Sequence, residues 1–438
     1  MSLEQPNFET GIKNIFTAGF RRGIKSLRLH HLREIANFSM SPFLRPDIRQ
    51  LKDRLKERLS TDDPGDKLLA ENFLFLPHEV VLRASKFHFD SWLRDEFVGC
   101  LALNDPEVEY ELLHNFVKHR DENFHVPTTR LFGGKLLGER KWYFDDESTA
   151  LALIWRAKIA MMGKPLLNEE ITDHDKIFWQ YVLNEVRSHT KDGLFYTGAG
   201  IEKTWFDAFN FRERDIVTYN QGIYTTALIA AKTLGLEVSD SEIQQAAVGY
   251  NNLVHPSGRL QLSQKVPYYD VSSLFGEFLA QWLFNKRLLE KETVAKTYQS
   301  FIPLDTNSFK VVAKENGGFL DPSEFNEPYQ PMIYQNGREW VLFTVAARYV
   351  FERNSLFHHR EFWKDKLRTL IATKNAESVV PGERYTFDHS RVGHLWNSAV
   401  YAMAKKVMTA EDYQDAITNK LFRATIISEA SQLPNSSL

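Results

Sequence analysis

Helical segments follow one another in pairs along most of this chain, which limits the folds that it can adopt. From about residue 78, apolar residues recur at three- and four-residue spacing, as in IYTTALIAAKTLGL and SSLFGEFLAQWLF, which is the period of an α-helix. The predicted pairs are 91–103 with 107–119, 147–162 with 173–188, 219–234 with 240–253, 271–286 with 290–300, 339–352 with 359–373, and 394–406 with 410–424. No strand pattern of comparable length alternates with them, so we predict an all-α fold.

Six pairs at a spacing of about fifty to sixty residues predict an (α/α)6 barrel, in which inner and outer helices alternate. A chain of 438 residues is too long for most single-core domains, and a repeating architecture allows that length. We expect residues 78–438 to form the barrel and residues 1–77 to form a helical extension that packs on it. Between two predicted helices, Gly235 should end one and Ser239 or Asp240 should cap the next.

Unusual residues concentrate in the long segments that precede the first helix of each pair. Examples are KWYFDDES, DGLFYTGAGIEKTWFDAFNF and PGERYTFDHSRVGHLW, whereas the links inside pairs, such as LALNDPEV and LLEKET, are short and plain. In an (α/α)6 barrel these long segments lie at one end, so their side chains should converge on one rim. Rings stack on the C–H faces of sugars and polar groups bind hydroxyls. The combination therefore predicts a carbohydrate site.

Composition and missing motifs exclude several other classes. The net charge of −3 gives no basic surface for nucleic acid. The single cysteine, Cys100, excludes a disulfide framework, and the N-terminus has no apolar signal segment, so we expect a cytoplasmic protein. No run of about 18 apolar residues predicts a membrane span. Phosphate-binding glycine motifs and metal-ligand spacings are also missing, so we expect neither a cofactor nor a metal.

The order of the motifs resembles that of the six-hairpin (α/α)6 glycosidases over about residues 80–425. The nearest resemblance is to the amylo-α-1,6-glucosidase (glycogen-debranching) domain and the related glucosidase and mannosylglycerate-hydrolase group. DSWLRDEFVGCLAL resembles the opening motif of that family, although Leu93 stands where the family has Gly. DGLFYTG followed by KTWFDAF resembles its DGL…TWMDA segment, which implies that Asp207 is the general acid. ERYTFDHSRVGHLWNSAVYAM resembles its E-Y-Y segment, which implies that Glu383 is the general base.

The resemblance implies an α-linked glucoside or mannoside as substrate, hydrolysed with inversion by these two carboxyl groups. TYNQGIYTTAL and YQNGREW match further helix starts of the family, and Asp145–Asp146 is similar to a catalytic Asp pair of α-mannanase-like barrels. The residues expected to bind substrate are Arg94, Asp95, Asp145, Asp146, Trp205, Tyr219, Asn220, Gln221, Tyr334, Asn336, Trp340, His394 and Trp396.

The sequence neighbours of Asp207 and Glu383 favour the roles of general acid and general base, respectively. A general acid must keep its proton, and the apolar neighbours Trp205, Phe206 and Phe209 should raise the pKa of Asp207 if the segment is buried. Glu383 stands beside Arg384, and an adjacent cation favours the charged carboxylate that a base requires.

Other interpretations remain open at this stage. Glu339 is a rival base, or a first-turn residue that interacts with its helix dipole. Asp145 and Asp146 could cap the helix that begins near Glu147. A sugar epimerase of the acylglucosamine-epimerase type would use histidines such as His389 and His394 as acid and base. A barrel that binds carbohydrate without catalysis is the third possibility, because fold alone does not decide function.

Overall fold

A computed structural model of the protein describes residues 44–76, 79–85, 91–130, 142–162, 173–301, 309–327, 329–356, 360–380, 383–387 and 392–418. Helices dominate these residues and the strands are short, so the predicted all-α class is confirmed. The helices are α3 (Pro46–Arg58), α4 (Pro64–Asn72), α5 (Leu93–Leu103), α6 (Pro106–Val117), α8 (Ser148–Met161), α9 (Asp173–Ser188), α10 (Thr218–Thr233), α11 (Asp240–Asn251), α12 (Phe275–Phe284), α13 (Lys291–Phe301), α14 (Val341–Arg353), α15 (Arg360–Ala372), α16 (Trp396–Val407) and α17 (Ala410–Thr418).

The strands form small antiparallel pairings in the connections between helices. They are β1 (Phe73–Leu76) with β2 (Glu79–Leu82), β3 (Ser91–Trp92) with β4 (Thr129–Arg130) and β5 (Trp142–Tyr143), β6 (Thr190–Lys191) with β7 (Leu194–Phe195), β8 (Tyr269–Asp270) with β9 (Val312–Ala313), and β10 (Val379–Val380) with β11 (Glu383–Phe387). They fasten the long segments to one another without forming an extended sheet.

All six predicted helix pairs are present, with ends that differ from the prediction by a few residues. The predicted capping is also found, since Gly235 has a left-handed φ of 73° just after α10 and the Ser239 side chain accepts from the Glu242 amide at the start of α11. α12 begins later than expected because Val271–Leu274 form a 3-10 turn (η3), which the Asp270 side chain caps.

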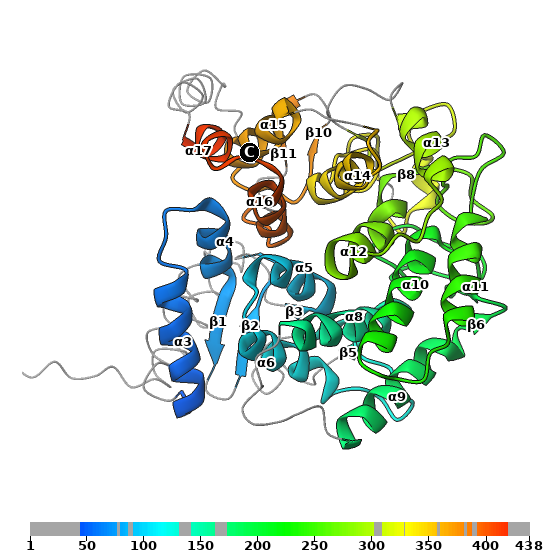
Figure 1. The fold of residues 1–438 in the computed structure, drawn as a ribbon. Helices are drawn as coiled ribbons and strands as arrows, with labels where there is room; N and C mark the ends of the chain where they lie inside the picture. The colour runs from blue at the N-terminus through cyan, green and yellow to red at the C-terminus, as the bar shows by residue number, and fades with distance from the viewer. Residues whose placement is uncertain are drawn as a thin grey trace, which may run out of the picture.

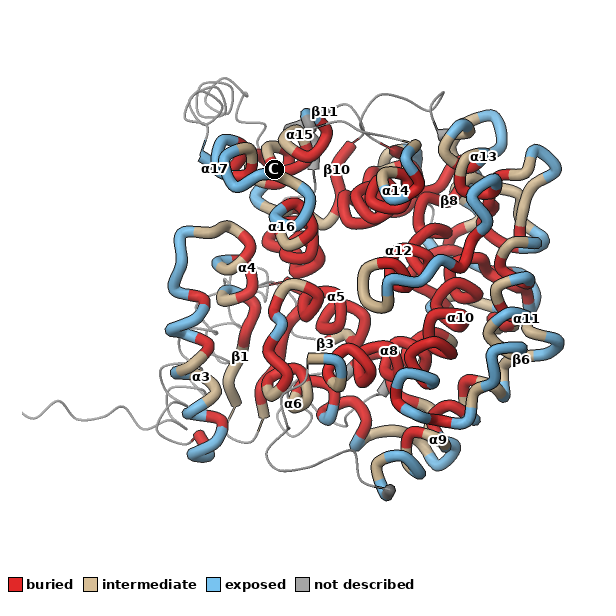
Figure 2. Tube along the Cα trace, in the orientation of Figure 1, coloured by how far each residue is buried: buried red, intermediate tan, exposed pale blue. Residues whose placement is uncertain are grey.

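The first helices of the six pairs pack side by side in a closed circuit. α5 contacts α8, α8 contacts α10, and the contacts continue through α12, α14 and α16 back to α5. These helices are buried on nearly all sides, as α8 and α10 illustrate, which explains their apolar content all round. The second helices lie outside the circuit and expose one face (Figures 1 and 2).

Two glycines allow α10 and α12 to approach each other closely. A Cβ atom at Gly276 of α12 would lie 2.4 Å from the Cα atom of Gly222 in α10. The hydroxyl of Thr226 donates to the carbonyl oxygens of both glycines, at 2.9 Å each. The α10–α12 contact is therefore made through backbone atoms.

The described part of the N-terminal extension packs where the circuit closes. α4 contacts both α16 and α5. The Asp63 carboxylate caps α4, accepts from the Tyr413 hydroxyl at 2.7 Å and pairs with Lys405 at 2.9 Å. The predicted domain boundary after residue 77 stays a prediction, although β1 and β2 pair across it, with Leu76 opposite Glu79.

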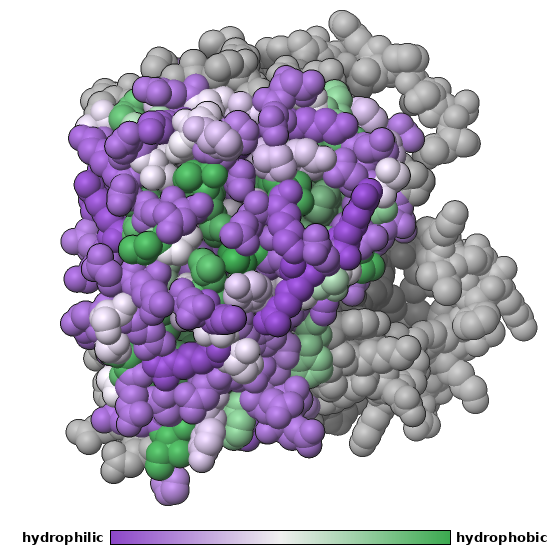
Figure 3. Space-filling model, turned by 90° about the vertical axis from the view of Figure 1, so that its right-hand side faces the viewer, coloured by the Kyte–Doolittle hydropathy of each residue, from purple (hydrophilic) through white to green (hydrophobic). Residues whose placement is uncertain are grey.

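The face that carries α11 and α13, on the right of Figure 1, is mainly hydrophilic, with small scattered apolar areas (Figure 3). Among the described residues, no helix combines the length and apolar content needed to cross a membrane.

Candidate active site

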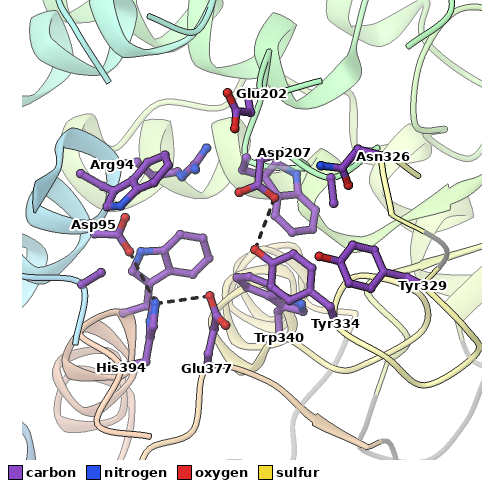
Figure 4. Close-up of a pocket in the computed structure, with 15 residues that line it drawn as sticks. Arg94, Asp95, Glu202, Asp207, Asn326, Tyr329, Tyr334, Trp340, Glu377 and His394 are labelled. Atoms are coloured by element: carbon purple, nitrogen blue, oxygen red, sulfur yellow. Dashed lines mark hydrogen bonds and ion pairs between the residues drawn. The ribbon is translucent and has the colours of Figure 1, made fainter. Parts of the chain in front are cut away.

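A pocket of about 300 Å³ opens where the segments that precede α5, α10, α14 and α16 meet. No described residue of the segments before α8 and α12 lines it. The lining residues are Ala84, Trp92, Arg94, Asp95, Glu202, Trp205, Asp207, Ala208, Asn326, Tyr329, Tyr334, Trp340, Glu377, His394 and Trp396 (Figure 4). Carboxyl groups and aromatic rings therefore share one small space.

The segment that carries Asp207 is folded back on itself and fastened to its neighbour. Gly200 and Phe211 exchange backbone hydrogen bonds of 2.7 and 3.1 Å. The Ala208 carbonyl accepts from the amide of Asn326 at 2.9 Å, which joins the segment before α10 to the segment before α14. Asp207 is thus held at a junction of two long connections rather than on a free loop.

Asp207 lies partly exposed to the pocket and receives two side-chain hydrogen bonds. Gln335 Nε2 donates to its Oδ1 at 2.9 Å, and the Tyr334 hydroxyl donates to the same oxygen at 3.3 Å. Burial among the surrounding protein atoms raises the pKa of Asp207, Arg94 opposes that change, and the charge of Glu377 adds to it. Asp207 is therefore suited to hold a proton at a higher pH than an exposed Asp does.

A second acidic cluster faces the same pocket. His394 Nε2 lies 3.6 Å from Asp95 Oδ1 and 3.5 Å from Glu377 Oε1, so one imidazole stands between two carboxyl groups. Figure 4 shows Glu377 and Asp207 on opposite sides of the pocket in this view. Burial raises the pKa of Asp95 to about 7, against the effect of Arg94 and with that of Glu377.

A buried ion pair lies next to the acidic cluster. Arg94 pairs with Glu147, whose other carboxylate oxygen accepts from the Trp205 amide at 3.1 Å. Both charged side chains are almost completely buried, at 7% and 0% exposed. Glu147 thereby ties α5 to the segment that carries Asp207.

Aromatic rings form the walls of the pocket. The Trp340 ring lies 5.4 Å from Trp205, 5.5 Å from Tyr334 and 5.3 Å from Trp396, measured between centroids. Tyr329 continues the row at 5.4 Å from Tyr334. Rings arranged in this way can contact the apolar face of a sugar while the carboxyl groups bind hydroxyls.

The structure brings together eight of the residues expected in the site. They are Arg94, Asp95, Trp205, Asp207, Tyr334, Trp340, His394 and Trp396, all of which line the pocket.

The Asp pair does not line the pocket. Asp145 Oδ1 accepts from the amides of Glu147 and Ser148 at 3.1 and 2.7 Å, which places it at the start of α8 as a helix cap. Asp146 accepts from the amide of Gly198 and so holds a neighbouring segment. The contacts of Asp145 agree with the capping interpretation, whereas Asp146 binds a different segment.

Four further predicted ligands also lie outside the pocket lining: Tyr219, Asn220 and Gln221 in the first turn of α10, and Asn336 before α14. Gln221 bonds to Phe195, Gly193 and Ala246 and fastens segments of the scaffold. Asn336 bonds to Leu320 and Tyr329. Tyr219 is buried in the core, where its ring stacks on Phe275. Asn220 is also buried and donates a hydrogen bond to Thr197.

The two candidate bases named from the sequence have different outcomes. Glu339 is buried and pairs with Lys366 at 2.5 Å, away from the pocket lining. Glu383 begins β11, and its side chain lies outside the described residues, so its role stays a prediction. His389 also lies outside the described residues.

Sequence reasoning missed Glu377, Glu202, Asn326 and Tyr329 as pocket residues. A signal for Glu377 existed, because it is a carboxylate in the connection between α15 and α16, which precedes the last inner helix. The resemblance to the family's E-Y-Y segment and the neighbouring Arg384 favour Glu383 instead, six positions further along.

No protein-family model matches the sequence, and no curated protein matches it significantly. Solved structures match the fold. The GH63 mannosylglycerate hydrolase from Thermus thermophilus in complex with glucose has a TM-score of 0.55 and 11% identity, over 78% of this chain and 98% of that chain. Its complex with Tris and D-glycerate gives 0.53 and 10%, over 82% and 100%. An uncharacterized conserved protein from that organism gives 0.51 and 11%, over 80% and 100%. The expected resemblance is confirmed at the level of the fold.

Proposed function

We propose that this protein is a glycoside hydrolase that inverts the anomeric centre of an α-linked glucoside or mannoside. The observation that carries the proposal is the pairing of Asp207 with Glu377 across an aromatic-walled pocket. Glycoside hydrolysis needs one protonated carboxyl group at the leaving oxygen and one carboxylate on the other side of the sugar. Two acidic groups that line one pocket from different segments support this proposal.

Asp207 is the general acid in this proposal. Its pKa is raised by burial, so more of it carries a proton near neutral pH than of an ordinary Asp. Its carboxyl group belongs to a segment fixed by Glu147 and Gln335, which hold the Trp205 amide and carbonyl at 3.1 and 3.0 Å. A rigid support of this kind keeps an acid aligned with the oxygen that it protonates.

Glu377 is the general base, in place of the Glu383 expected from the sequence. His394 Nε2 lies 3.5 Å from Glu377 Oε1 and so holds this carboxyl group beside the pocket. A carboxylate at this position can take a proton from a water molecule that attacks the anomeric carbon.

Fold and pocket size support the choice of substrate class. The circuit of helix pairs is consistent with the (α/α)6 barrel, in which residues 78–438 would be the catalytic domain and the preceding residues an extension. The similar hydrolase acts on mannosylglycerate and has been solved with glucose and with D-glycerate. A pocket of about 300 Å³ suits a short glycoside better than a polysaccharide chain.

The test is release of free sugar from a panel of α-glucosides, α-mannosides and short oligosaccharides, with the product anomer followed by NMR. We expect hydrolysis with inversion, and a loss of about 10²- to 10⁴-fold in kcat for Asp207→Asn, because general acid catalysis contributes about that much. Glu377→Ala, which leaves room for an azide ion, should lose activity that azide restores, whereas Glu383→Ala should retain it.

The outcomes separate the remaining alternatives. Interconversion of free sugars without hydrolysis, surviving in Asp207→Asn and lost in His394→Ala or His389→Ala, would replace the proposal by an epimerase. Tight binding of a sugar with no turnover would replace it by a carbohydrate-binding protein.

A further inference from the structure

Gln335 makes three hydrogen bonds that together enclose the Asp207 segment. Its Oε1 accepts from the Ala208 amide at 3.2 Å. Its Nε2 donates to the Trp205 carbonyl at 3.0 Å and to Asp207 Oδ1 at 2.9 Å. Gln335 is completely buried, and the proposed roles of acid and base give it no part in the proton transfer.

These contacts fix which end of the Gln335 amide faces Asp207. If the amide were reversed, its NH₂ group would meet the Ala208 N–H and its oxygen would meet the Trp205 carbonyl, so two pairs of like groups would face each other. Only the orientation with Nε2 towards Asp207 satisfies all three neighbours. The group that faces Asp207 Oδ1 is therefore always a donor.

The second donor to Asp207 reaches the same oxygen. The Tyr334 hydroxyl lies 3.3 Å from Oδ1, on the side of the pocket (Figure 4). In a neutral carboxylic acid, one oxygen accepts hydrogen bonds and the other carries the proton. With two donors aimed at Oδ1, the proton belongs on Oδ2.

We propose that Gln335 is a positioning residue that gives the two oxygens of Asp207 different tasks. Oδ1 accepts from the protein, and Oδ2 carries the proton that passes to the substrate. The inference rests on the proposed hydrolase function and adds to it the atom that delivers the proton.

The reaction then balances as follows. The bond between the anomeric carbon and the leaving oxygen breaks, its electron pair stays on that oxygen, and the Oδ2 proton of Asp207 joins it to release an alcohol. A water oxygen bonds to the anomeric carbon and loses one proton to Glu377. Exchange with solvent returns a proton to Asp207 and removes one from Glu377. Throughout, Gln335 Nε2 stays on Oδ1 and stabilises the carboxylate that forms.

The experiment compares Gln335→Leu with the wild type on two glycosides of the same sugar, one with an alkyl alcohol and one with 2,4-dinitrophenol as leaving group. Dinitrophenolate leaves without protonation, so its release depends little on the acid. We expect kcat for the alkyl glycoside to fall about 10- to 100-fold, and at least about tenfold more than kcat for the dinitrophenyl glycoside. Gln180→Leu, in the outer helix α9, is the matched control and should keep the wild-type ratio.

The pH profile gives a readout that a purely structural role would not move. The Gln335 donor lowers the pKa of Asp207. In Gln335→Leu, the decrease of kcat on the alkaline side of the pH profile (the basic limb) should therefore occur at higher pH. The maximum value of kcat should be lower than in the wild type. Tyr334→Phe should shift the limb in the same direction. Equal losses on both glycosides with an unmoved basic limb would overturn the inference.

Two further measurements keep the test decisive. Gln335→Glu keeps the acceptor for Ala208 and covers the case in which the Leu variant does not fold. It should also move the basic limb to higher pH.

Infrared difference spectra against Asp207→Asn report the C=O stretch of the protonated acid, which should rise in frequency when Gln335 no longer donates to Oδ1. An unmoved band overturns the inference in an active hydrolase. A moved band in an enzyme that hydrolyses nothing supports the proton placement and rejects the hydrolase.

Discussion

At the scale of single residues, burial decides the chemistry of the acidic groups. Moving a carboxylate out of water penalises its charged form, so a buried Asp keeps its proton to higher pH unless cations and donors compensate. Asp207 combines burial with donors on one oxygen, whereas Asp95 is raised to a pKa of about 7 beside Arg94. Burial thus raises the pKa of both Asp side chains in the pocket, but different hydrogen-bond donors oppose that effect at the two positions.

Asp270 allows a clean test of this effect outside the pocket. Burial raises its pKa from 3.8 to about 7, although Ser272 donates to its Oδ1. The folded state therefore retains a proton that the unfolded state releases. The stability contribution is full below pH 4 and is lost as the pH rises towards about 7, at a slope of up to about 1 kcal/mol per pH unit.

Asp270→Asn should remove that slope. Urea unfolding at pH 5 to 8 should show that the variant is the more stable protein at pH 8 and that the advantage shrinks at pH 5. The same pH dependence in both proteins would show that Asp270 is charged in the folded state.

The Arg94–Glu147 pair gives a second prediction at this scale. Glu147→Ala leaves the Arg94 guanidinium buried without its main partner and removes the acceptor of the Trp205 amide. We expect a loss of about 3–5 kcal/mol in the free energy of unfolding, measured by urea titration. Glu292→Ala is the control, because Glu292 pairs with Lys296 on an exposed helix face and should leave the unfolding midpoint unchanged. Similar midpoints for both variants would contradict the structural role of Glu147.

At the scale of helices, residue size sets how closely neighbours approach. α10 and α12 meet at Gly222 and Gly276, where the Thr226 hydroxyl donates to both backbones. A side chain at either position would push the two helices apart. The segment that carries Asp207 leads directly into α10, so this contact also places the candidate acid.

Gly276→Ala tests the contact. The new methyl group would meet backbone atoms of Gly222 at 2.2–2.5 Å, which cannot rotate away. We expect a loss of about 1–3 kcal/mol or more in stability, by the usual cost of overpacking. In Gly318→Ala the new methyl group meets only the end of the Asn316 side chain, so thermal unfolding of this control should match the wild type. Equal melting temperatures for all three proteins would mean that the helices separate at little cost.

At the scale of the whole molecule, the described N-terminal helices join the two ends of the circuit. α4 lies against α5 and α16, the first and last inner helices. The Asn72 side chain donates to the Gly393 carbonyl at 3.1 Å, one residue before His394 of the pocket. Closing the circuit and placing His394 are therefore linked.

Asp63→Ala should weaken this closure. The variant loses the cap of α4, the bond from Tyr413 and the ion pair with Lys405. Loss of the cap alone costs about 1 kcal/mol, and we expect about 1–3 kcal/mol in total from urea unfolding. Asp62→Ala, at the exposed neighbouring position, should match the wild type. Equal stability of the two variants would show that the extension contributes little to the closure.

Local patterns in the sequence were enough to predict the helices and their pairing. Periodic apolar residues, Gly235 and Ser239 act over one or two helical turns, so local physics is enough to predict them. The acidic and aromatic segments before the inner helices could also be identified from local sequence. Of their predicted site residues, Asp95, Asp207 and Trp340 line the pocket.

Which polar residues meet depends on the packing of distant segments and became clear only in the folded chain. Asp145 caps a helix and Gln221 fastens the scaffold, although both looked like ligands in the sequence. Gln335 reaches the site through a hydrogen bond to Asp207, 128 positions earlier in the chain, and Glu377 lines the same pocket as Asp207 and Asp95. The role of a polar side chain depends on its burial and on the partners that distant segments bring to it. A local sequence pattern contains neither.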